Sequence, residues 1–444
     1  MRSRSSIIVI FVIALGLLFP DGAAAEFTFA LTGFEDELVV DDLPSPTALA
    51  WLPPNENEDL LITTRGGGIF RFDDPGPAQQ LLNLNNTICS GGETGLLGIG
   101  VHPDFEGGQR FIYVYYTDRK GNGDCNEANN RANRLSRFTM NDQDQLVNEQ
   151  VLIDNISARG GNHNGGDIQF GADGNLYISV GDAGRDLRTG ETQDDNRNAR
   201  RLDLLNGKIL RITPEGGIPN DNPFLGPGTS RCRVAGGIEL QGGGVSVEKK
   251  SKRQKRKARK RKRQNRRDRR QPTICQEIFA TGLRNPYRIA LDPNGTPGAQ
   301  RFFINDVGGN GFEEVNEGEA GGDYGWNIRE GLCPIDNISN NCSGSSQFVD
   351  PIFAYRTGGS LGTLANCRTI TGGAFPPGGP WPGDYLFADF GCDGLFALTG
   401  SGSGADVELF ASGEGASHLA FGPDGALYYT TFSGGGQVRR VVAE

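Results

Sequence analysis

The stretch "DIQFGADGNLYISVGD", residues 167–182, joins two apolar runs through a turn rich in Gly, Asp and Asn. Asp and Asn tolerate tight turns and Gly supplies positive φ, so this phrase predicts a β-hairpin. The phrase recurs five more times, in copies that begin at Ala48, Gly98, Arg288, Thr371 and His418. Most copies are followed by another short apolar run, such as "GIFRF" or "KILRI".

A hairpin repeated at intervals of tens of residues is typical of a β-propeller. One hairpin cannot bury both of its faces, whereas sheets stacked around an axis bury the faces of their neighbours. The six copies therefore predict an all-β fold with one six-bladed propeller domain over residues 26–444. Residues 27–40 are expected to supply the strand that closes the ring with the last blade. A β-sandwich or two separate β domains is the alternative.

The N-terminus has the pattern of a secretory signal peptide, predicted over residues 1–25. Arg2 and Arg4 precede the apolar run Ile7 to Phe19, and small residues at 23–25 offer a cleavage site. An uncleaved membrane anchor is the alternative. No later segment is long and apolar enough to be a membrane helix, so we expect a secreted chain without a membrane span.

The cysteine count fits an oxidising compartment. An even number of cysteines behind a signal peptide predicts disulfides, and this chain has eight. Pairing neighbours in order gives 89–125, 232–275, 333–342 and 367–392, but eight cysteines allow about 105 connectivities and the sequence does not choose among them. No zinc-type Cys/His spacing is present. Sequons predict a glycoprotein, with acceptors at Asn85, Asn155, Asn294, Asn337 and Asn341.

Residues 249–270, "KKSKRQKRKARKRKRQNRRDRR", form a basic low-complexity insertion. The run has a net charge of +15, and because the whole chain has −10 the remainder has −25. A block of like charge repels itself, which predicts a disordered loop inserted at the rim of the propeller. Such a loop is a solvated segment, a site for a polyanion such as a glycosaminoglycan, or a site of cleavage by a basic-site protease. A signal peptide argues against nucleic-acid binding.

Several phrases together are similar to the glucose/sorbosone dehydrogenase family. They are "ETGLLGIGVHPDF" (93–105), "HNGGDIQFGADGNLYISVGD" (163–182), "LNGKILRI" (205–212), "EIFATGLRNPYRIALDP" (277–293), "NDVGGNGFEEVNEGEAGGDYGWNIREG" (305–331) and "TGGAFPP" (371–377). The family comprises soluble aldose dehydrogenases that use pyrroloquinoline quinone (PQQ), together with hedgehog-interacting-protein-like propellers. The resemblance covers nearly the whole chain apart from the basic insertion, and it implies the propeller already predicted.

The resemblance also implies roles for individual residues. His163 matches the base that takes the proton of the sugar C1 hydroxyl while a hydride passes to the quinone, and an imidazole suits that role. Asp182 matches an acid that orients this histidine. Arg284 and Asn285 match the cofactor-binding motif, in which a fixed cation stabilises the reduced quinone. The alternative for His163 is a structural residue that caps a blade turn. The alternative for Arg284 is an ion pair between blades.

Two calcium sites are implied by the same resemblance. The carbonyls of Gly308 and Gly309 are expected to bind a calcium that also contacts the quinone. Glu313, Glu314 and the Tyr324 carbonyl match a second, structural calcium site, and hard oxygen ligands of this kind suit calcium. The alternative for Glu313 and Glu314 is a solvated acidic face.

The sequence departs from the family where the quinone carboxylates bind. The quinone-dependent dehydrogenases of the family have a pair of arginines before the last "GPDG" phrase, but residues 413–425 here are "GEGASHLAFGPDG". A cofactor-binding lysine is replaced by "FADFGCDGLF", with Asp389, Cys392 and Asp393, so acids stand where bases are needed. Arg356 and Arg368 are candidates for a rebuilt site. Two functions therefore stay open: a quinone-dependent sugar dehydrogenase, or a secreted propeller that binds a protein or glycan without turnover.

Overall fold

The computed structural model describes residues 26–192, 195–232, 274–295, 300–339, 342–360 and 362–444. The predicted signal peptide and the basic run 249–270 lie outside these residues. The described part is built of strands, with short 3₁₀ helices η1 (Pro54–Glu56), η2 (Lys120–Asn122), η3 (Ala128–Asn130), η5 (Asn198–Arg200), η6 (Gly402–Gly404) and η7 (Ser433–Gly435).

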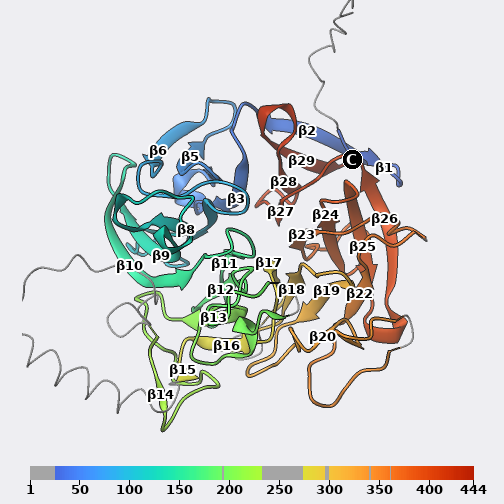
Figure 1. Ribbon diagram of the computed structural model, residues 1–444. Coiled ribbons are helices and arrows are strands. Elements are labelled where there is room, and N and C mark those ends of the chain that lie inside the picture. The colour runs from blue at the N-terminus through green and yellow to red at the C-terminus, as the bar shows by residue number, and fades with distance from the viewer. Residues whose placement is uncertain (1–25, 193–194, 233–273, 296–299, 340–341, 361) are drawn as a thin grey trace, which may run out of the picture.

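Six sheets of four or five strands are arranged around one axis as the blades of a propeller (Figure 1). Blade 1 contains β3 (Pro46–Trp51), β4 (Leu60–Thr64), β5 (Gly68–Phe72) and β6 (Gln79–Asn83). Blade 2 contains β7 (Leu96–Val101), β8 (Phe111–Arg119), β9 (Arg131–Met140) and β10 (Leu146–Ser157). Blade 3 contains β11 (Ile168–Phe170), β12 (Leu176–Val180), β13 (Lys208–Ile212) and β16 (Ile278–Thr281).

The second half of the chain forms the other three blades. Blade 4 contains β17 (Pro286–Leu291), β18 (Phe302–Asp306), β19 (Phe312–Glu317) and β22 (Phe353–Arg356). Blade 5 contains β23 (Ile370–Ala374), β24 (Tyr385–Asp389), β25 (Gly394–Thr399), β26 (Asp406–Ser412) and, at its edge, β1 (Thr28–Phe29). Blade 6 contains β27 (His418–Phe421), β28 (Leu427–Thr431), β29 (Gln437–Ala443) and β2 (Phe34–Val40).

The prediction of a six-bladed propeller is confirmed, and each repeated phrase forms the first hairpin of a blade. The ring is closed by the N-terminal segment, as predicted, because β2 pairs antiparallel with β29 and sets Phe34 opposite Ala443. The first strands of the blades contact one another in a closed circle around the axis, in the order β3, β7, β11, β17, β23 and β27. The pairing of β1 with β26 was not predicted.

The hydrophobic core consists of one cluster in each of the six gaps between neighbouring blades of the described chain. Successive strand residues point to opposite faces of a sheet, and both faces of a blade are covered. In β4, Leu61 packs toward blade 2 and Ile62 packs toward blade 6. Two-sided burial explains why the middle strands are continuous apolar runs rather than alternating patterns.

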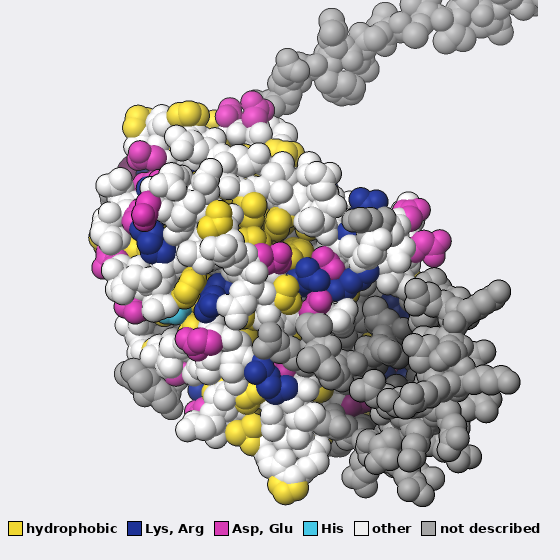
Figure 2. Space-filling model, turned by 90° about the vertical axis from the view of Figure 1, so that its left-hand side faces the viewer, with side chains coloured by type: hydrophobic (Ala, Val, Ile, Leu, Met, Phe, Trp, Pro, Cys, Tyr) yellow, Lys and Arg dark blue, Asp and Glu magenta, His cyan; other side chains and the backbone are white. Residues whose placement is uncertain are grey.

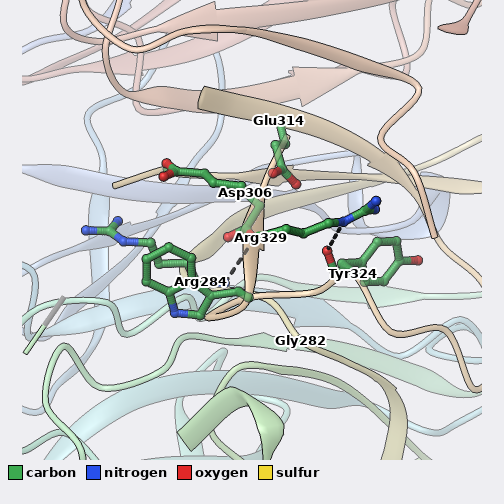
Figure 3. Close-up of a pocket in the computed structure, with 9 residues that line it drawn as sticks. Gly282, Arg284, Asp306, Glu314, Tyr324 and Arg329 are labelled. Carbon is green, nitrogen blue, oxygen red and sulfur yellow. Dashed lines mark hydrogen bonds between the residues drawn. The ribbon is translucent and has the colours of Figure 1, made fainter. Parts of the chain in front are cut away.

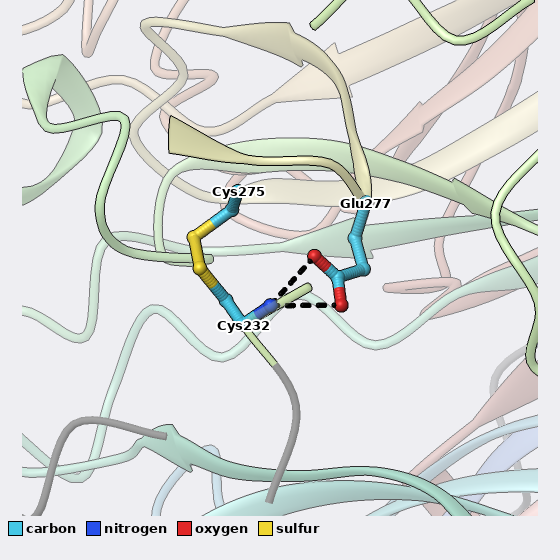
Figure 4. A group of neighbouring side chains, drawn as sticks. All are labelled: Cys232, Cys275 and Glu277. Atoms are coloured by element: carbon cyan, nitrogen blue, oxygen red, sulfur yellow. Dashed lines mark hydrogen bonds between the residues drawn. A yellow bond between two sulfur atoms is a disulfide. The ribbon is translucent and has the colours of Figure 1, made fainter. Parts of the chain in front are cut away.

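All four disulfides join cysteines that are neighbours in the sequence, so the pairing that the sequence left open is the in-order one. Cys232–Cys275 stands at the base of the insertion, beside the parallel pair β14 (Thr229–Ser230) and β15 (Ile274–Cys275). Both carboxylate oxygens of Glu277 accept a hydrogen bond from the main-chain N–H of Cys232 at 3.0 Å (Figure 4). The two ends of the insertion are thus fixed to each other and to blade 3.

The outer surface of blades 1 and 2 carries acidic and basic side chains next to one another, as the side view shows (Figure 2). Arg71 pairs with Asp144 at 2.8 Å and also with Asp59, and Arg110 pairs with Glu56. No helix in the described part of the chain has the length and apolar character that a membrane crossing requires.

Candidate active site

Several of the predicted site residues lie where the first strand of a blade begins or its second strand ends. His163 precedes β11 and Asp182 follows β12, while Arg284 precedes β17 and Gly308 follows β18. Because every blade repeats the same course from its innermost strand, these ends lie on one face of the ring. The main-chain N–H of Asp182 donates to the Arg284 carbonyl at 2.8 Å, so blades 3 and 4 meet at this mouth of the propeller.

His163 and Asp182 form a hydrogen-bonded pair, with 2.7 Å between Nδ1 and Oδ1, and both side chains are buried. A carboxylate accepts hydrogen bonds, so in the neutral imidazole Nδ1 carries the proton and Nε2 has the lone pair. The backbone of His163 is left-handed, with φ +52°, and its carbonyl accepts a hydrogen bond from Ala183. A Cβ on Gly181 would lie 2.1 Å from that carbonyl oxygen, which explains the glycine there.

Two further donors hold the Asp182 carboxylate. The Trp326 indole N–H donates to Oδ2 at 2.9 Å, and the main-chain N–H of Gly184 donates to Oδ1 at 2.7 Å. Three donors around one carboxylate fix its orientation. Trp326 was not among the predicted site residues, and its indole N–H gives it a polar role in the site.

Glu93 is a second residue that sequence reasoning missed. Its Oε2 accepts hydrogen bonds from the main-chain N–H of His163 at 2.7 Å and from the Asn285 side chain at 3.2 Å. The Asn285 Oδ1 in turn accepts from the N–H of Gly165 at 3.1 Å. The sequence did contain a signal for Glu93, because this acid opens the phrase "ETGLLGIGVHPDF". Glu93 and Asn285 therefore link blades 2, 3 and 4 around His163.

Arg284 lies next to this group. Its guanidinium carbon lies 5.4 Å from the Trp326 ring centroid, and Nη1 donates to the Val307 carbonyl at 3.0 Å. The buried Nε has no hydrogen-bond partner among the described residues. Asp306 holds the main chain here, because its carboxylate accepts from the N–H groups of Arg284 at 2.9 Å and Asn285 at 2.6 Å.

A small pocket adjoins Arg284 (Figure 3). Its walls include three buried carboxyl groups, those of Asp306, Glu314 and Glu330, and a second guanidinium, that of Arg329. Burial, and then the charge of Glu314, raise the pKa of Asp306 well above its ordinary value. Burial raises the pKa of Glu314 to about 7 and also raises the pKa of Glu330. The pocket therefore favours either a bound cation or the protonated form of its own acidic side chains.

The residues expected to bind the second calcium are divided between two places. Glu314 and Tyr324 line the pocket, but Glu313 is turned toward blade 5, where its carboxylate accepts from the N–H groups of Ile370 and Gly308. The Tyr324 carbonyl accepts a hydrogen bond from Arg329 Nε at 3.3 Å (Figure 3). Sequence neighbours on a strand face opposite ways, which explains the separation of Glu313 from Glu314.

The main chain at Gly308 and Gly309 is held by two acids. The N–H of Gly308 donates to Glu313 at 3.1 Å, and the N–H of Gly309 donates to Glu330. This turn leads out of β18 at the same mouth as His163. The acidic anchors keep the turn beside the pocket.

The other two histidines each accept a hydrogen bond from a main-chain N–H group. His418 is buried, its Nδ1 accepts from the N–H of Leu49 at 3.0 Å, and burial lowers its pKa well below the ordinary value. His102 accepts at Nδ1 from the N–H of Asp104 at 3.0 Å. Both contacts give these histidines structural roles.

Two groups of acidic and cysteine side chains in the described residues are close enough to surround a metal ion. They are Cys232, Cys275 and Glu277 (Figure 4), and Cys367, Asp389 and Cys392. The cysteines of each group are joined in a disulfide and have no thiolate to offer, so neither group is a thiolate metal site.

Comparison with known proteins gives a family match over most of the chain. The model of the family described as "Glucose / Sorbosone dehydrogenase" matches residues 43–235 and 264–440. An aldose sugar dehydrogenase of Escherichia coli is 26% identical over 291 residues, which are 65% of this chain and 61% of that protein. The quinoprotein glucose dehydrogenase B of Acinetobacter calcoaceticus is 24% identical over 306 residues, which are 66% of this chain and 52% of that protein. The alignments thus span little more than half the length of these relatives.

A solved structure has the same fold. The structure of a putative oxidoreductase (glucose dehydrogenase) from Thermus thermophilus superposes with a TM-score of 0.65 and 27% sequence identity. It covers 92% of this chain and 100% of its own chain.

Proposed function

Because the chain belongs to the glucose/sorbosone dehydrogenase family, we propose that it is a secreted dehydrogenase that oxidises an aldose at C1. The observation that carries this proposal is the 2.7 Å hydrogen bond from His163 Nδ1 to Asp182, which leaves Nε2 as a proton acceptor. In the proposed reaction the C1 hydroxyl gives its proton to Nε2, and the C1 hydrogen leaves as a hydride. The resulting imidazolium is stabilised by the Asp182 carboxylate.

The proposed hydride acceptor is PQQ, which when bound would supply a quinone that takes the hydride, that is, two electrons and a proton. Arg284 suits an anionic quinone oxygen because its buried Nε has no hydrogen-bond partner in the described chain. The guanidinium is held by Val307 and by the Trp326 ring, so little reorganisation accompanies binding. Asn285 is proposed as a second cofactor-binding residue beside Glu93.

Calcium is proposed to bind at only one of the two sites that the sequence predicted. The turn at Gly308 and Gly309, anchored by Glu313 and Glu330, is proposed to offer carbonyl oxygens to a calcium beside the quinone. The set of Glu313, Glu314 and the Tyr324 carbonyl does not fit one ion. Glu313 faces blade 5, and Arg329 already donates to the carbonyl, so no step is derived through calcium there.

The cellular setting is part of the same proposal. Four disulfides support an extracellular location, and the sequons are proposed to be glycosylated there. The basic run at 249–270 is proposed to bind a polyanion such as a glycosaminoglycan, because it carries +15 on a chain whose remainder is acidic.

Reconstitution tests the proposal. Purified protein is mixed with PQQ and calcium, and the reduction of a dye is followed with a panel of aldoses. We expect turnover in the wild type and a loss of about 10²–10⁴-fold in His163→Ala, with unchanged thermal stability. His102→Ala, which removes a histidine with a local turn contact, is the matched control and should retain activity. A wild type that binds no quinone at micromolar concentration would sink the proposal.

A second candidate is a secreted propeller that binds a protein or glycan without turnover. The observation that favours it is the lack of arginine in residues 413–425. The same preparation decides between the candidates. A wild type that takes up no quinone but binds immobilised glycans, with or without His163→Ala, supports the binder.

A further inference from the structure

A series of contacts leads from blade to blade along the face of the ring that contains His163. Next to Glu93, the carbonyl of Gly92 accepts a hydrogen bond from Arg65 Nη1 at 2.9 Å. The guanidinium carbon of Arg65 lies 5.9 Å from the ring centroid of Phe432, and this ring contacts that of Phe390 at 5.8 Å. These contacts lead from blade 2 through blade 1 to blades 6 and 5.

These residues stand opposite His163. Arg65 follows β4, Phe390 follows β24 and Phe432 follows β28, the strand position that Asp182 has in blade 3. They therefore share its face of the ring. Blade 6 is three blades away from blade 3 in a ring of six, so Phe432 lies across the axis from His163, with Arg65 and Phe390 on its two sides.

The environment of Arg65 leaves its charge available. Its partners are neutral: the Gly92 carbonyl, the Ser45 hydroxyl at 3.3 Å and the Phe432 ring. No carboxylate in the described part of the chain forms an ion pair with it. A guanidinium has five N–H donors, and these two hydrogen bonds use two of them.

The two aromatic rings are open to solvent. Phe390 and Phe432 are each 38% exposed, among the few large apolar residues in the described chain that are not covered. Gly415, in the stretch where the family has arginines, packs against the Phe390 ring, which a Cβ there would approach to 2.9 Å. The sector opposite His163 therefore presents apolar rings and one cation.

Two acids of this sector, Asp389 and Glu414, are engaged elsewhere, whereas Asp393 is exposed and its carboxylate lies beside Gly415. The carboxylate of Asp389 is buried and accepts from the Tyr355 hydroxyl at 2.6 Å and from the main-chain N–H groups of Arg368, Thr369, Gly391 and Cys392. Glu414 is buried and accepts from the Thr431 hydroxyl. Asp389 is thus a structural residue of the blade 5 turn, held by a hydroxyl and four main-chain N–H groups.

We propose that Arg65, Phe390 and Phe432 form a subsite for a carboxylate carried by a planar aromatic ring. The subsite rests on the proposed function. In it Arg65, from blade 1, binds the quinone carboxylate, for which residues 413–425 supply no arginine. The unpaired guanidinium binds the carboxylate, and the exposed rings contact the plane of the ligand.

Equilibrium binding to the protein without cofactor tests the subsite. Titration calorimetry with PQQ, in calcium, compares the wild type with Arg65→Gln and with Arg137→Gln. Arg137 is the matched control, because its guanidinium carbon lies 3.9 Å from the centroid of the Phe111 ring and it also has neutral partners, but it lies on β9, away from the mouth. We expect Arg65→Gln to weaken binding by about 10-fold or more, and Arg137→Gln to bind as the wild type does.

A second titration separates this proposal from the proposed function. Benzene-1,3,5-tricarboxylate is a planar carboxylate with no quinone, and it should bind the wild type more tightly than Arg65→Gln. Equal binding of PQQ by wild type and Arg65→Gln overturns the subsite and leaves the dehydrogenase proposal intact. If PQQ does not bind but the tricarboxylate does so through Arg65, the dehydrogenase proposal fails and the subsite stands. Binding of neither ligand overturns both.

Discussion

At the scale of single residues, Asp182 determines how the candidate base is presented. It receives hydrogen bonds from His163, Trp326 and Gly184, so its orientation depends on segments from two blades. Because His163 has a left-handed backbone, held by Glu93 through its N–H, the imidazole is fixed at both its main chain and Nδ1. The geometry therefore leaves Nε2 as the reactive position.

Lys208 gives the fold a pH dependence that can be measured. The residue is fully buried behind the site, where Nζ donates to the carbonyls of Ala199 and Asn206, each at 2.8 Å. Burial lowers its pKa from 10.5 to about 7. Between these values the unfolded chain holds a proton that the folded chain has lost, so stability falls as the pH falls from about 10 to 7.

Urea unfolding at pH 7.5 and 9.5 checks this prediction against Lys208→Met, which cannot titrate. Groups common to both proteins cancel in the comparison. The free energy of unfolding of the wild type should gain roughly 3 kcal/mol relative to the variant over these two pH units. Parallel pH profiles would show that Lys208 keeps its proton in the fold.

At the scale of elements, the strands that follow a turn phrase could be predicted, because Gly, Asp and Asn determine a hairpin locally. The six first hairpins and the closing strand were found this way. Strand β16 was not, since it joins β13 only after the long insertion. The candidate site divides similarly: His163 and Asp182 flank one hairpin, whereas Trp326 reaches Asp182 across 144 positions. No local pattern indicates such a contact.

The loop from β19 to β22 contains an internal cation, which leads to a prediction about calcium. Arg329 is buried, donates to the Tyr324 carbonyl at 3.3 Å and pairs with Asp350 at 2.5 Å. Its charge also lowers the pKa of Glu314, against the larger effect of burial. We therefore expect EGTA to leave the melting temperature of the quinone-free wild type unchanged.

Arg329→Met should lose about 1–3 kcal/mol of stability, because it leaves the carbonyl of buried Tyr324 without this donor, and millimolar calcium should restore part of the loss. Arg301→Met, which removes a surface cation paired with Asp292 and Glu317, is the control and should change stability by less than about 0.5 kcal/mol. A clear drop in the wild-type melting temperature on EGTA treatment would mean that calcium shares this pocket with Arg329.

At the scale of the whole molecule, the ring is held by two kinds of closure. Pairing of β2 with β29 joins the two ends of the described chain. The disulfides act over short distances in the sequence, from 9 to 43 residues, so they fix loops and do not span the ring. Cys232–Cys275 differs from the others in enclosing the basic insertion, and this has a consequence for proteolysis.

Cleavage within residues 249–270 should leave a two-chain protein that keeps its fold. Trypsin cuts after Lys and Arg, and this run holds 16 of them. The cut ends stay joined by Cys232–Cys275 and by the pairing of β14 with β15, while β16 remains in blade 3. Brief digestion should therefore give one band of nearly full size without reductant, two bands with it, and a melting temperature within a few degrees of the intact protein.

The double variant Cys232→Ser/Cys275→Ser should give two bands under both conditions. Loss of the cooperative melting transition after a single cut would contradict the prediction, because it would mean that the insertion itself supports the ring.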